Sequence, residues 1–176
     1  MEIIHQLRTE ELRRNEGTEG TLVSIGCMGA TYFDWIHENL GYPHKHIGLE
    51  YYAPRPDILP PNVVWIANTA GNMADVATGS VDLIFGGQVV EHLWADELVN
   101  FFHECCRVLK PGGRLMFDTP NERITSHAGW KHPEHTIEFR PDDARTLLDH
   151  LGFAGEMWDL SSDIDGASSS RAPGPR

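Results

Sequence analysis

The residues best suited to chemistry begin with a glycine-containing turn and an acid further along the chain. Residues 21–30 read TLVSIGCMGA, an apolar run that leads into small residues at Gly26 and Gly29, and a second apolar run ends on Glu50. A strand that enters such a turn lets the backbone approach a ligand closely, and an acid at the tip of the next strand can accept bonds from both ribose hydroxyls. This pairing predicts a site for a nucleoside-containing cofactor.

Three other side chains fall within or beside this site. Cys27 and Met28 lie in the turn itself, and Tyr51 follows the acid, where its ring could stack on an adenine base. Met28 and Ala30 stand where the usual glycine-rich turn has glycines, so the turn alone is a weak signal.

A second group of candidate residues is rich in histidine. Residues 127–139 read HAGWKHPEHTIEF, with His132 and His135 three positions apart, and His92 lies earlier in the chain. A histidine whose pKa is near neutral can act as the general base that deprotonates a hydroxyl. A metal site is the alternative for His132, His135 and Glu138, but the proline between the histidines and the lack of an HExxH helix count against zinc, and we predict none. A loop held by local hydrogen bonds is the non-catalytic alternative.

The elements that must position these residues follow an alternating pattern. Short apolar runs alternate with helical spacing, which predicts βαβ units and an α/β fold with a doubly wound, mostly parallel sheet. A charged N-terminal helix at residues 10–14 is expected to lie outside that sheet. Ligands of such a sheet bind at the carboxyl ends of its strands, where all the candidates fall. The predicted strands are Thr21–Ile25, His46–Glu50, Val63–Ala67, Val81–Phe85, Arg114–Asp118 and Phe153–Leu160.

Three sequence blocks carry a family resemblance. They are GNMAD at 71–75, SVDLIFGGQVVEHL at 80–93 and RVLKPGGRL at 107–115. In this order they resemble the class I S-adenosylmethionine-dependent methyltransferases, in the type 11-like branch that acts on small molecules and glycans. The resemblance covers residues 20–160 and implies a Rossmann-like sheet with S-adenosylmethionine as cofactor.

The resemblance also implies roles for single residues. Asn72 corresponds to a residue whose side-chain oxygen accepts a bond from the adenine amino group, and the backbone N–H of Met73 would donate to the adenine ring. Gly87 and Gln88 follow the fourth predicted strand, where the methionine part of the cofactor is held. The loop with His132 and His135 would lie over the mouth of the acceptor site.

The resemblance leaves one part of the expected fold without a segment. The family's sheet closes with an antiparallel seventh strand, and no stretch of this sequence fits it. We predict a single methyltransferase domain over residues 1–160 that lacks this strand, with the sheet edge open or covered by a homodimer partner or another domain. Residues 161–176 are rich in Ser, Gly, Pro and Asp, which predicts a disordered tail.

Composition narrows the range of partners. The chain has 176 residues, with 14 basic side chains against 26 acidic ones and a formal net charge of −12. Nucleic acid is therefore a poor partner, because phosphate binding needs clustered Lys and Arg. No apolar run has the length of a membrane span and the N-terminus lacks a secretory pattern, which predicts a cytoplasmic protein. Cys27, Cys105 and Cys106 are expected to be core thiols.

These observations predict an enzyme that moves a methyl group from S-adenosylmethionine to a small-molecule or glycan-like acceptor, at oxygen. Such a transfer mainly requires that donor and acceptor be aligned and water excluded. Two alternatives remain open at this point. One is a degenerate methyltransferase fold that binds or scaffolds without catalysis, and the other is an NAD(P)-dependent oxidoreductase.

Overall fold

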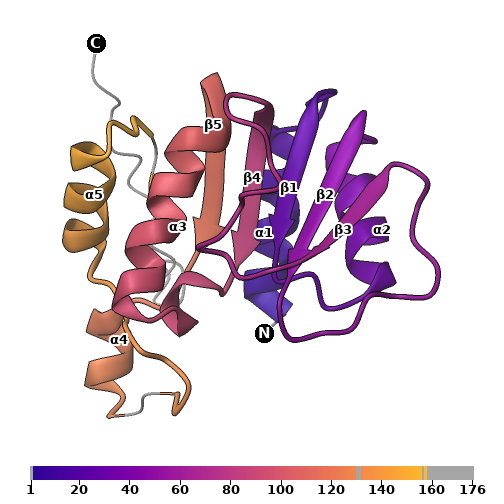
Figure 1. The fold of residues 1–176 in the computed structure, drawn as a ribbon. Helices are drawn as coiled ribbons and strands as arrows, with labels where there is room; N and C mark the ends of the chain where they lie inside the picture. The colour runs from indigo at the N-terminus through magenta and orange to yellow at the C-terminus, as the bar shows by residue number, and fades with distance from the viewer. Residues whose placement is uncertain (1, 130–131, 156, 158–176) are drawn as a thin grey trace.

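The computed structural model describes residues 2–129, 132–155 and 157, and within them five strands form one all-parallel sheet (Figure 1). The strands lie in the order β3-β2-β1-β4-β5. The strands β2 and β3 are added on one side of β1, and β4 and β5 on its other side. The direction of chain progression therefore reverses between β1 and β4, which makes this the switch point of the sheet. The strands are β1 (Thr21–Ile25), β2 (Lys45–Glu50), β3 (Val63–Ala67), β4 (Val81–Gly87) and β5 (Leu109–Asp118).

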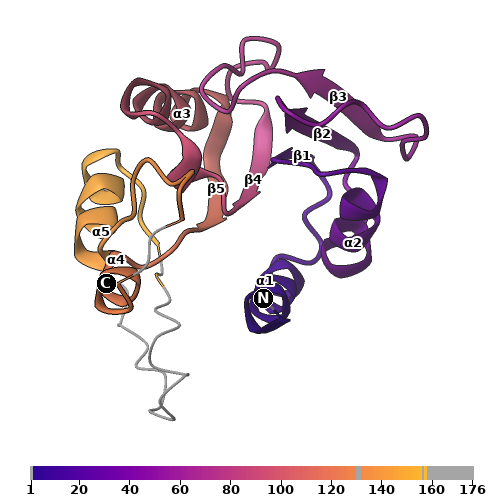
Figure 2. The ribbon, with the colours of Figure 1, turned by 90° about the horizontal axis from the view of Figure 1, so that it is seen from below.

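Helices cover both faces of the sheet. Figure 2 shows α3 on one face and α1 and α2 on the other, which is the doubly wound arrangement that the sequence predicts. The helices are α1 (Glu2–Arg14), α2 (Ala30–Leu40), α3 (Ala95–Val108), α4 (Glu122–His127) and α5 (Pro141–His150), with a single 3-10 turn η1 (Val90–His92) after β4. None of these described helices has the length and apolar character that a membrane crossing requires.

Alternate side chains of the central strands build a separate core on each face. Val23 and Ile84 pack with the α3 side chains Phe101 and Phe102. The intervening residues, among them Leu22 and Leu83, pack with α1 and α2 on the other face. Because side chains of a strand alternate between its faces, both faces of β1 and β4 must be apolar, and this explains why these strands are readable as continuous apolar runs.

The first five predicted strands are confirmed, with longer bounds for β2, β4 and β5. The start of β5 differs most, because the strand begins at Leu109 and includes the Lys-Pro-Gly-Gly segment. Val81 pairs with Leu109, and the register then shifts so that Leu83 pairs with Arg114. This bulge absorbs the turn residues into the strand, whereas the sequence pattern had suggested that they separate helix from strand.

The predicted strand Phe153–Leu160 is wrong over its described part. Phe153–Gly155 form no strand, and the remainder of the segment, apart from Met157, lies outside the described residues. Gly152 has a φ of 82° and starts a turn after α5, and the Phe153 N–H donates to the Leu148 carbonyl. Phe153 packs partly buried against the core on the α3 face. Within the described part of the chain the sheet therefore ends at β5, and the predicted tail at 161–176 lies outside it.

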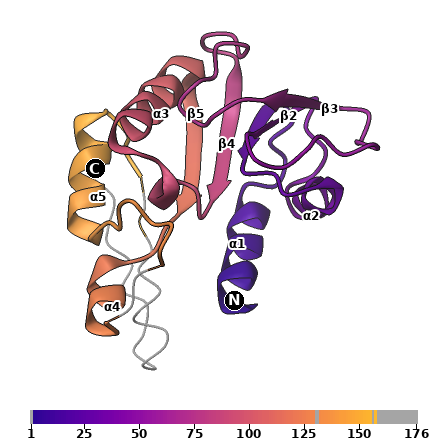
Figure 3. The same ribbon diagram turned by 60° about the horizontal axis from the view of Figure 1, so that its bottom comes forward.

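The N-terminal helix is longer and better packed than expected. It runs over Glu2–Arg14 and buries Leu12 completely in the core shared with α2. Its N-terminal end reaches the carboxyl edge of the sheet (Figure 3), where Arg8 pairs with Asp118 at the end of β5. The expectation for the cysteines is confirmed for Cys27 and Cys105 but not for Cys106, which is exposed.

Candidate functional site

The glycine turn connects β1 to α2 at the carboxyl edge of the sheet. Gly26 and Gly29 have φ values of 74° and 134°, which L side chains rarely adopt, so glycine is required at both positions. Met28 is 87% exposed and points away from the core. Cys27 is fully buried, and its thiol donates to the Ser24 carbonyl at 3.2 Å. The turn therefore offers its backbone, rather than the Cys27 side chain, to a ligand.

Glu50 ends β2 beside this turn, and only one oxygen of its carboxylate is hydrogen-bonded by the described residues. The residue is 6% exposed, and Oε1 accepts bonds from the backbone N–H groups of Tyr52 and Ala53 at 2.7 and 2.9 Å. No described residue bonds the second oxygen, Oε2. The neighbouring Tyr51 is 62% exposed. One carboxylate oxygen thus fixes the following loop, and the other is available to a ligand at the strand end.

Asn72 and Met73 are placed differently from their expected role. Met73 is buried in the core, and its backbone N–H donates to the Glu104 carboxylate at 2.9 Å. The Asn72 side-chain oxygen accepts from the Ala74 N–H at 3.2 Å. In this arrangement the N–H of Met73 is already used within the protein and is not available to an adenine ring.

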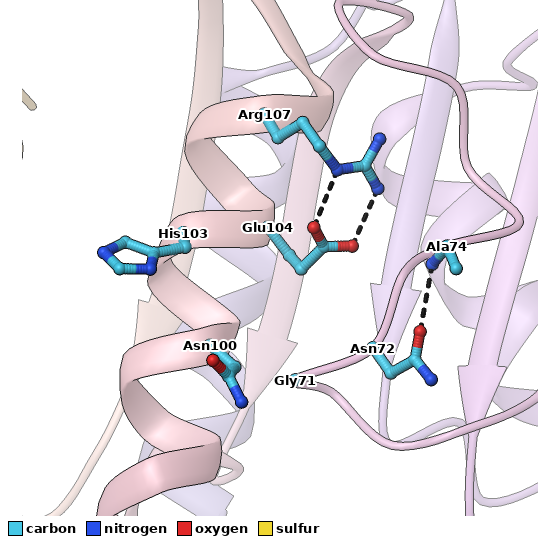
Figure 4. A pocket seen from close by; sticks show the side chains of 7 residues that line it. All are labelled: Gly71, Asn72, Ala74, Asn100, His103, Glu104 and Arg107. Carbon is cyan, nitrogen blue, oxygen red and sulfur yellow. Dashed lines mark hydrogen bonds and ion pairs between the residues drawn. The ribbon is translucent and has the colours of Figure 1, made fainter.

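A pocket of about 320 Å³ lies beside this loop, against the outer surface of α3 (Figure 4). Within it, Glu104 and Arg107 form a two-bond ion pair, and Arg107 also donates to the Met73 carbonyl at 2.8 Å. These bonds tie the loop to the helix. Except for Asn72, none of the predicted site residues lines this pocket, so we assign the pair a structural role. The lining residues are Gly71, Asn72, Ala74, Asn100, His103, Glu104 and Arg107.

Gly87 ends β4, Gln88 follows it, and both lie against the pair formed by Arg8 and Asp118. Gln88 has a φ of 55°, an unusual value for a residue with a side chain, and its amide donates to Asp118 at 2.7 Å. Arg8 donates to both oxygens of Asp118, each at 2.7 Å. A Cβ on Gly87 would lie 2.9 Å from Arg8 Nε, so the space above this glycine is occupied by the guanidinium.

The three predicted histidines come together next to β4. His92 lies on η1, and its ring centroid is 4.9 Å from that of His135 and 6.2 Å from that of His132. His135 Nδ1 bonds Glu138 at 2.7 Å, and both side chains are nearly buried. The structure therefore brings His92, which the sequence places apart from the loop of His132 and His135, against that loop at η1. The roles of the three histidines stay a prediction.

Glu91 belongs to the same cluster and was not among the predicted site residues. It is fully buried, and no residue in the described part of the chain makes a hydrogen bond of normal geometry to either carboxylate oxygen. Burial raises the pKa of this carboxyl to about 7, and the negative charge of Asp118 adds to the rise. The sequence signal was its position directly before His92, but an acid at the start of a helical turn is usually exposed.

A second polar cluster, which the sequence analysis also missed, lies under the glycine turn. The Ser24 hydroxyl bonds His46 Nε2 at 2.7 Å, and His46 Nδ1 bonds His37 Nε2 at 2.9 Å. Burial, with a smaller contribution from neighbouring His37, lowers the pKa of His46 to about 3. His46 is therefore neutral at physiological pH, and the cluster is a hydrogen-bonded part of the core.

Comparison with known proteins agrees with this architecture. A protein of Mycolicibacterium smegmatis, described as a probable S-adenosylmethionine-dependent methyltransferase, is 41% identical over 91 residues, which cover 49% of this chain and 34% of that protein. A malonyl-[acyl-carrier protein] O-methyltransferase of Methylococcus capsulatus is 49% identical over 47 residues, or 27% of this chain and 16% of that one. The chain thus spans about a third or less of the length of these relatives.

A solved structure shows the same fold over most of the chain. The crystal structure of an S-adenosylmethionine-dependent methyltransferase from Archaeoglobus fulgidus matches with a TM-score of 0.65 and 19% identity, over 88% of this chain and 71% of that one. Residues 23–117, from β1 to the end of β5, match the family described as a methyltransferase domain. Because this match includes the glycine turn, Glu50, the switch point and η1, the chain belongs to that methyltransferase family.

Proposed function

We propose that the chain binds S-adenosylmethionine at the Gly26–Gly29 turn and Glu50, and transfers its methyl group to a small-molecule or glycan-like acceptor, at oxygen. The observation that carries this proposal is the position of Glu50. Its carboxylate lies at the carboxyl end of β2 beside the switch point, with Oε1 fixed by two backbone bonds and Oε2 unbonded by any described residue. An oriented carboxylate of this kind can accept bonds from ribose hydroxyls.

The residues present fit the cofactor in its nucleoside half. Backbone at Gly26 and Gly29 can approach the ligand, Met28 borders the turn, and exposed Tyr51 offers an aromatic face next to Glu50. Cys27 contributes through its backbone. We leave Asn72 and Met73 out of the proposed site because their polar groups bond within the loop and to α3.

Gly87 and Gln88 remain proposed contacts for the methionine half. Arg8 and Asp118 already bond each other above them, so this end of the site is charged and closed by α1. The bound cofactor supplies an activated methyl group on a sulfonium. The chain's own part is to align donor and acceptor and to keep water out.

We propose that His92, His132 and His135 line the acceptor side. They lie beyond the end of β4, and His135 is oriented by Glu138 at 2.7 Å. A histidine oriented by a carboxylate can accept the proton of an acceptor hydroxyl. Replacing His132 with alanine should leave cofactor affinity within about threefold, a difference below roughly 0.7 kcal/mol, while lowering turnover.

Calorimetric titration with S-adenosylmethionine and S-adenosylhomocysteine tests the cofactor site. The variant Glu50→Gln keeps an acceptor oxygen for the loop but loses the charge, and it should bind the cofactor about tenfold more weakly. Glu19→Gln, an exposed acid at the opposite edge of the sheet, is the matched control and should bind as the parent does. Equal affinity in parent and Glu50→Gln would contradict the site.

A methyl-transfer assay beside this titration separates the proposal from a non-catalytic module. Met28 and Ala30 replace glycines of the usual turn, which is the observation that favours a degenerate site. Cofactor binding without turnover on any acceptor hydroxyl would support that alternative. The oxidoreductase alternative predicts that NADH or NADPH binds in place of the methyl donor, and titration with each of these tests it directly.

A further inference from the structure

We propose that Glu91, His92 and His135 form a binding site for a divalent metal ion of the zinc class. One potential ligand atom from each residue lies within 4.8 Å of the other two. Two imidazole nitrogens and one carboxylate oxygen are a donor set that holds zinc with the fourth position open. The sequence spacing of His132, His135 and Glu138 predicts no metal site, but that set of residues does not include Glu91.

The state of Glu91 indicates that a cation is needed. The side chain is completely buried, and among the described residues neither carboxylate oxygen has a hydrogen-bond partner of normal geometry. The buried Thr119 hydroxyl lies near Glu91 and favours its charged form, but it is not placed to make a hydrogen bond of normal geometry. A buried carboxylate without partners is costly, because its hydration is lost and not replaced. Coordination of a cation would compensate the carboxylate for this lost hydration.

Both histidines are held as metal-binding histidines usually are. His135 Nδ1 bonds the Glu138 carboxylate at 2.7 Å, and His92 Nδ1 bonds the Glu134 carbonyl at 3.3 Å. An oxygen acceptor at Nδ1 keeps the proton there, which leaves Nε2 as the unprotonated atom that can coordinate. The pattern of a carboxylate or carbonyl behind each ligand is the outer shell that metal sites use.

Backbone bonds hold the two segments of the cluster together without any ion. The N–H groups of Thr136 and Ile137 both donate to the Glu91 carbonyl, at 2.8 and 3.3 Å. The Thr136 hydroxyl donates to the Leu93 carbonyl. The loop that carries His135 is thereby fixed on η1, so that only small side-chain movements are needed to bring the ligand atoms to about 3.4 Å from one another around zinc.

The place of the cluster suggests what the open position would bind. The turn η1 begins two residues after Gln88, at the carboxyl edge of the sheet. If the proposed methyl transfer holds, an ion here would coordinate a hydroxyl or phosphate oxygen of the acceptor, and it would make a coordinated hydroxyl easier to deprotonate. With His92 and His135 as ligands, their Nε2 atoms could not also accept that proton, so His132 would be the histidine that serves as base. This last step depends on the proposed function, whereas the metal site itself does not.

Metal titration of the untagged, chelator-treated chain tests the site. Zinc binding is followed by calorimetry, and cobalt(II) binding by its visible absorption, which reports coordination by nitrogen and oxygen. We expect one ion per chain. Glu91→Gln and His135→Ala should each weaken binding at least about 100-fold, and Glu138→Gln, which removes only the outer carboxylate, about 10- to 100-fold.

The controls separate this site from surface binding and from misfolding. His44→Ala removes an exposed histidine elsewhere and should leave affinity unchanged. Circular dichroism confirms folding, and Glu91→Gln, which is nearly isosteric, remains informative if His135→Ala does not fold. The proposal is overturned if the parent binds no ion in one-to-one ratio, or if Glu91→Gln binds it as tightly. No methyl donor is present, so failure here leaves the cofactor site untouched.

Discussion

Two histidine clusters in this chain differ in how many of their polar groups have hydrogen-bond partners. Under the glycine turn, Ser24, His46 and His37 bond one another in sequence, and only Nδ1 of His37 lacks a partner. Next to β4, the cluster of Glu91, His92 and His135 has its ring nitrogens oriented, yet both oxygens of Glu91 lack partners. In the first cluster nearly every polar atom has a hydrogen-bond partner, whereas in the second cluster the most buried side chain has none among the described residues.

This difference distinguishes buried polar groups that stabilise the fold from buried polar groups that a ligand would complete. Buried groups that satisfy one another stabilise the fold, and their removal should reduce stability. A buried charge that the protein leaves unpaired costs stability and is retained where a ligand completes it. The two clusters should therefore respond to substitution with opposite signs.

The largest effect is expected for His46→Ala. This change leaves a cavity between β2 and α2 and removes the partners of the Ser24 hydroxyl and of His37 Nε2. The free energy of unfolding at pH 8 should fall by about 3–4 kcal/mol, measured by urea denaturation. His44→Ala, at an exposed position just before β2, should change it by less than about 0.5 kcal/mol. A loss below 1 kcal/mol for His46→Ala, roughly the value of one hydrogen bond, would show that the cluster is not structural.

Acidification should weaken the same cluster. Because the pKa of His46 is lowered to about 3 in the folded chain, the unfolded chain takes up the proton first as the pH falls below its usual value of 6.5. The stability from this group is complete above pH 6.5 and is lost progressively toward pH 3. At pH 5 the loss should be about 2 kcal/mol relative to pH 8. Denaturation at both pH values should show the gap between parent and His46→Ala narrowing at pH 5; a constant gap would contradict the assignment.

Glu91→Gln should stabilise the metal-free chain. The raised pKa means that the folded chain keeps the proton on Glu91 up to about pH 7, whereas the unfolded chain loses it near pH 4.5. Stability from this group is therefore present below pH 4.5 and is lost as the pH rises through 7. At pH 8 the free energy of unfolding of the variant should exceed that of the parent by about 1–2 kcal/mol. This gain is smaller than the pKa difference alone would give, because the buried amide of the variant also lacks hydrogen-bond partners. Thermal melts at pH 4.5 and 8, with chelator present, would measure this; a destabilised variant at pH 8 would place Glu91 with the structural cluster.

The smallest effect is expected for Arg8→Met, which removes the pair with Asp118. The pair of Arg8 with Asp118 is about one quarter exposed, so its charge is partly screened by solvent. Methionine preserves most of the apolar contact of the side chain, and stability should fall by about 1 kcal/mol. Urea denaturation at low and high salt would check this, since a loss that persists in high salt would indicate packing rather than charge.

Much of the fold could be predicted because its signals are local. The strands β1, β2 and β4 are short apolar runs between turn residues and are buried along most of their length, which makes both of their faces apolar. The strand β3 is only partly buried, and its signal is the apolar run itself. The segment at Phe153 has the same composition as an edge strand, but there the apolar side chain serves to pack a turn against α3 rather than to join a ladder. Composition alone does not distinguish these two uses.

The two sides of the site differ in the same way. The turn and Glu50 could be predicted because each lies at the end of a readable strand. The contacts of Glu91 could not, because its histidine partner His135 is brought to η1 by backbone bonds across the fold. Met73 was misassigned because Glu104, on a helix later in the chain, takes its N–H. Such pairings depend on tertiary packing that no local pattern encodes.

The bond between Arg8 and Asp118 also bears on how the chain reaches its native state. It joins the first helix to the last described strand across 110 positions of sequence. A contact of this range closes a long loop, and it becomes favourable only after the intervening strands have paired. We therefore expect its contribution to be absent from the folding transition state. The contact between the N-terminal helix and β5 would then lower the unfolding rate and leave the folding rate almost unchanged.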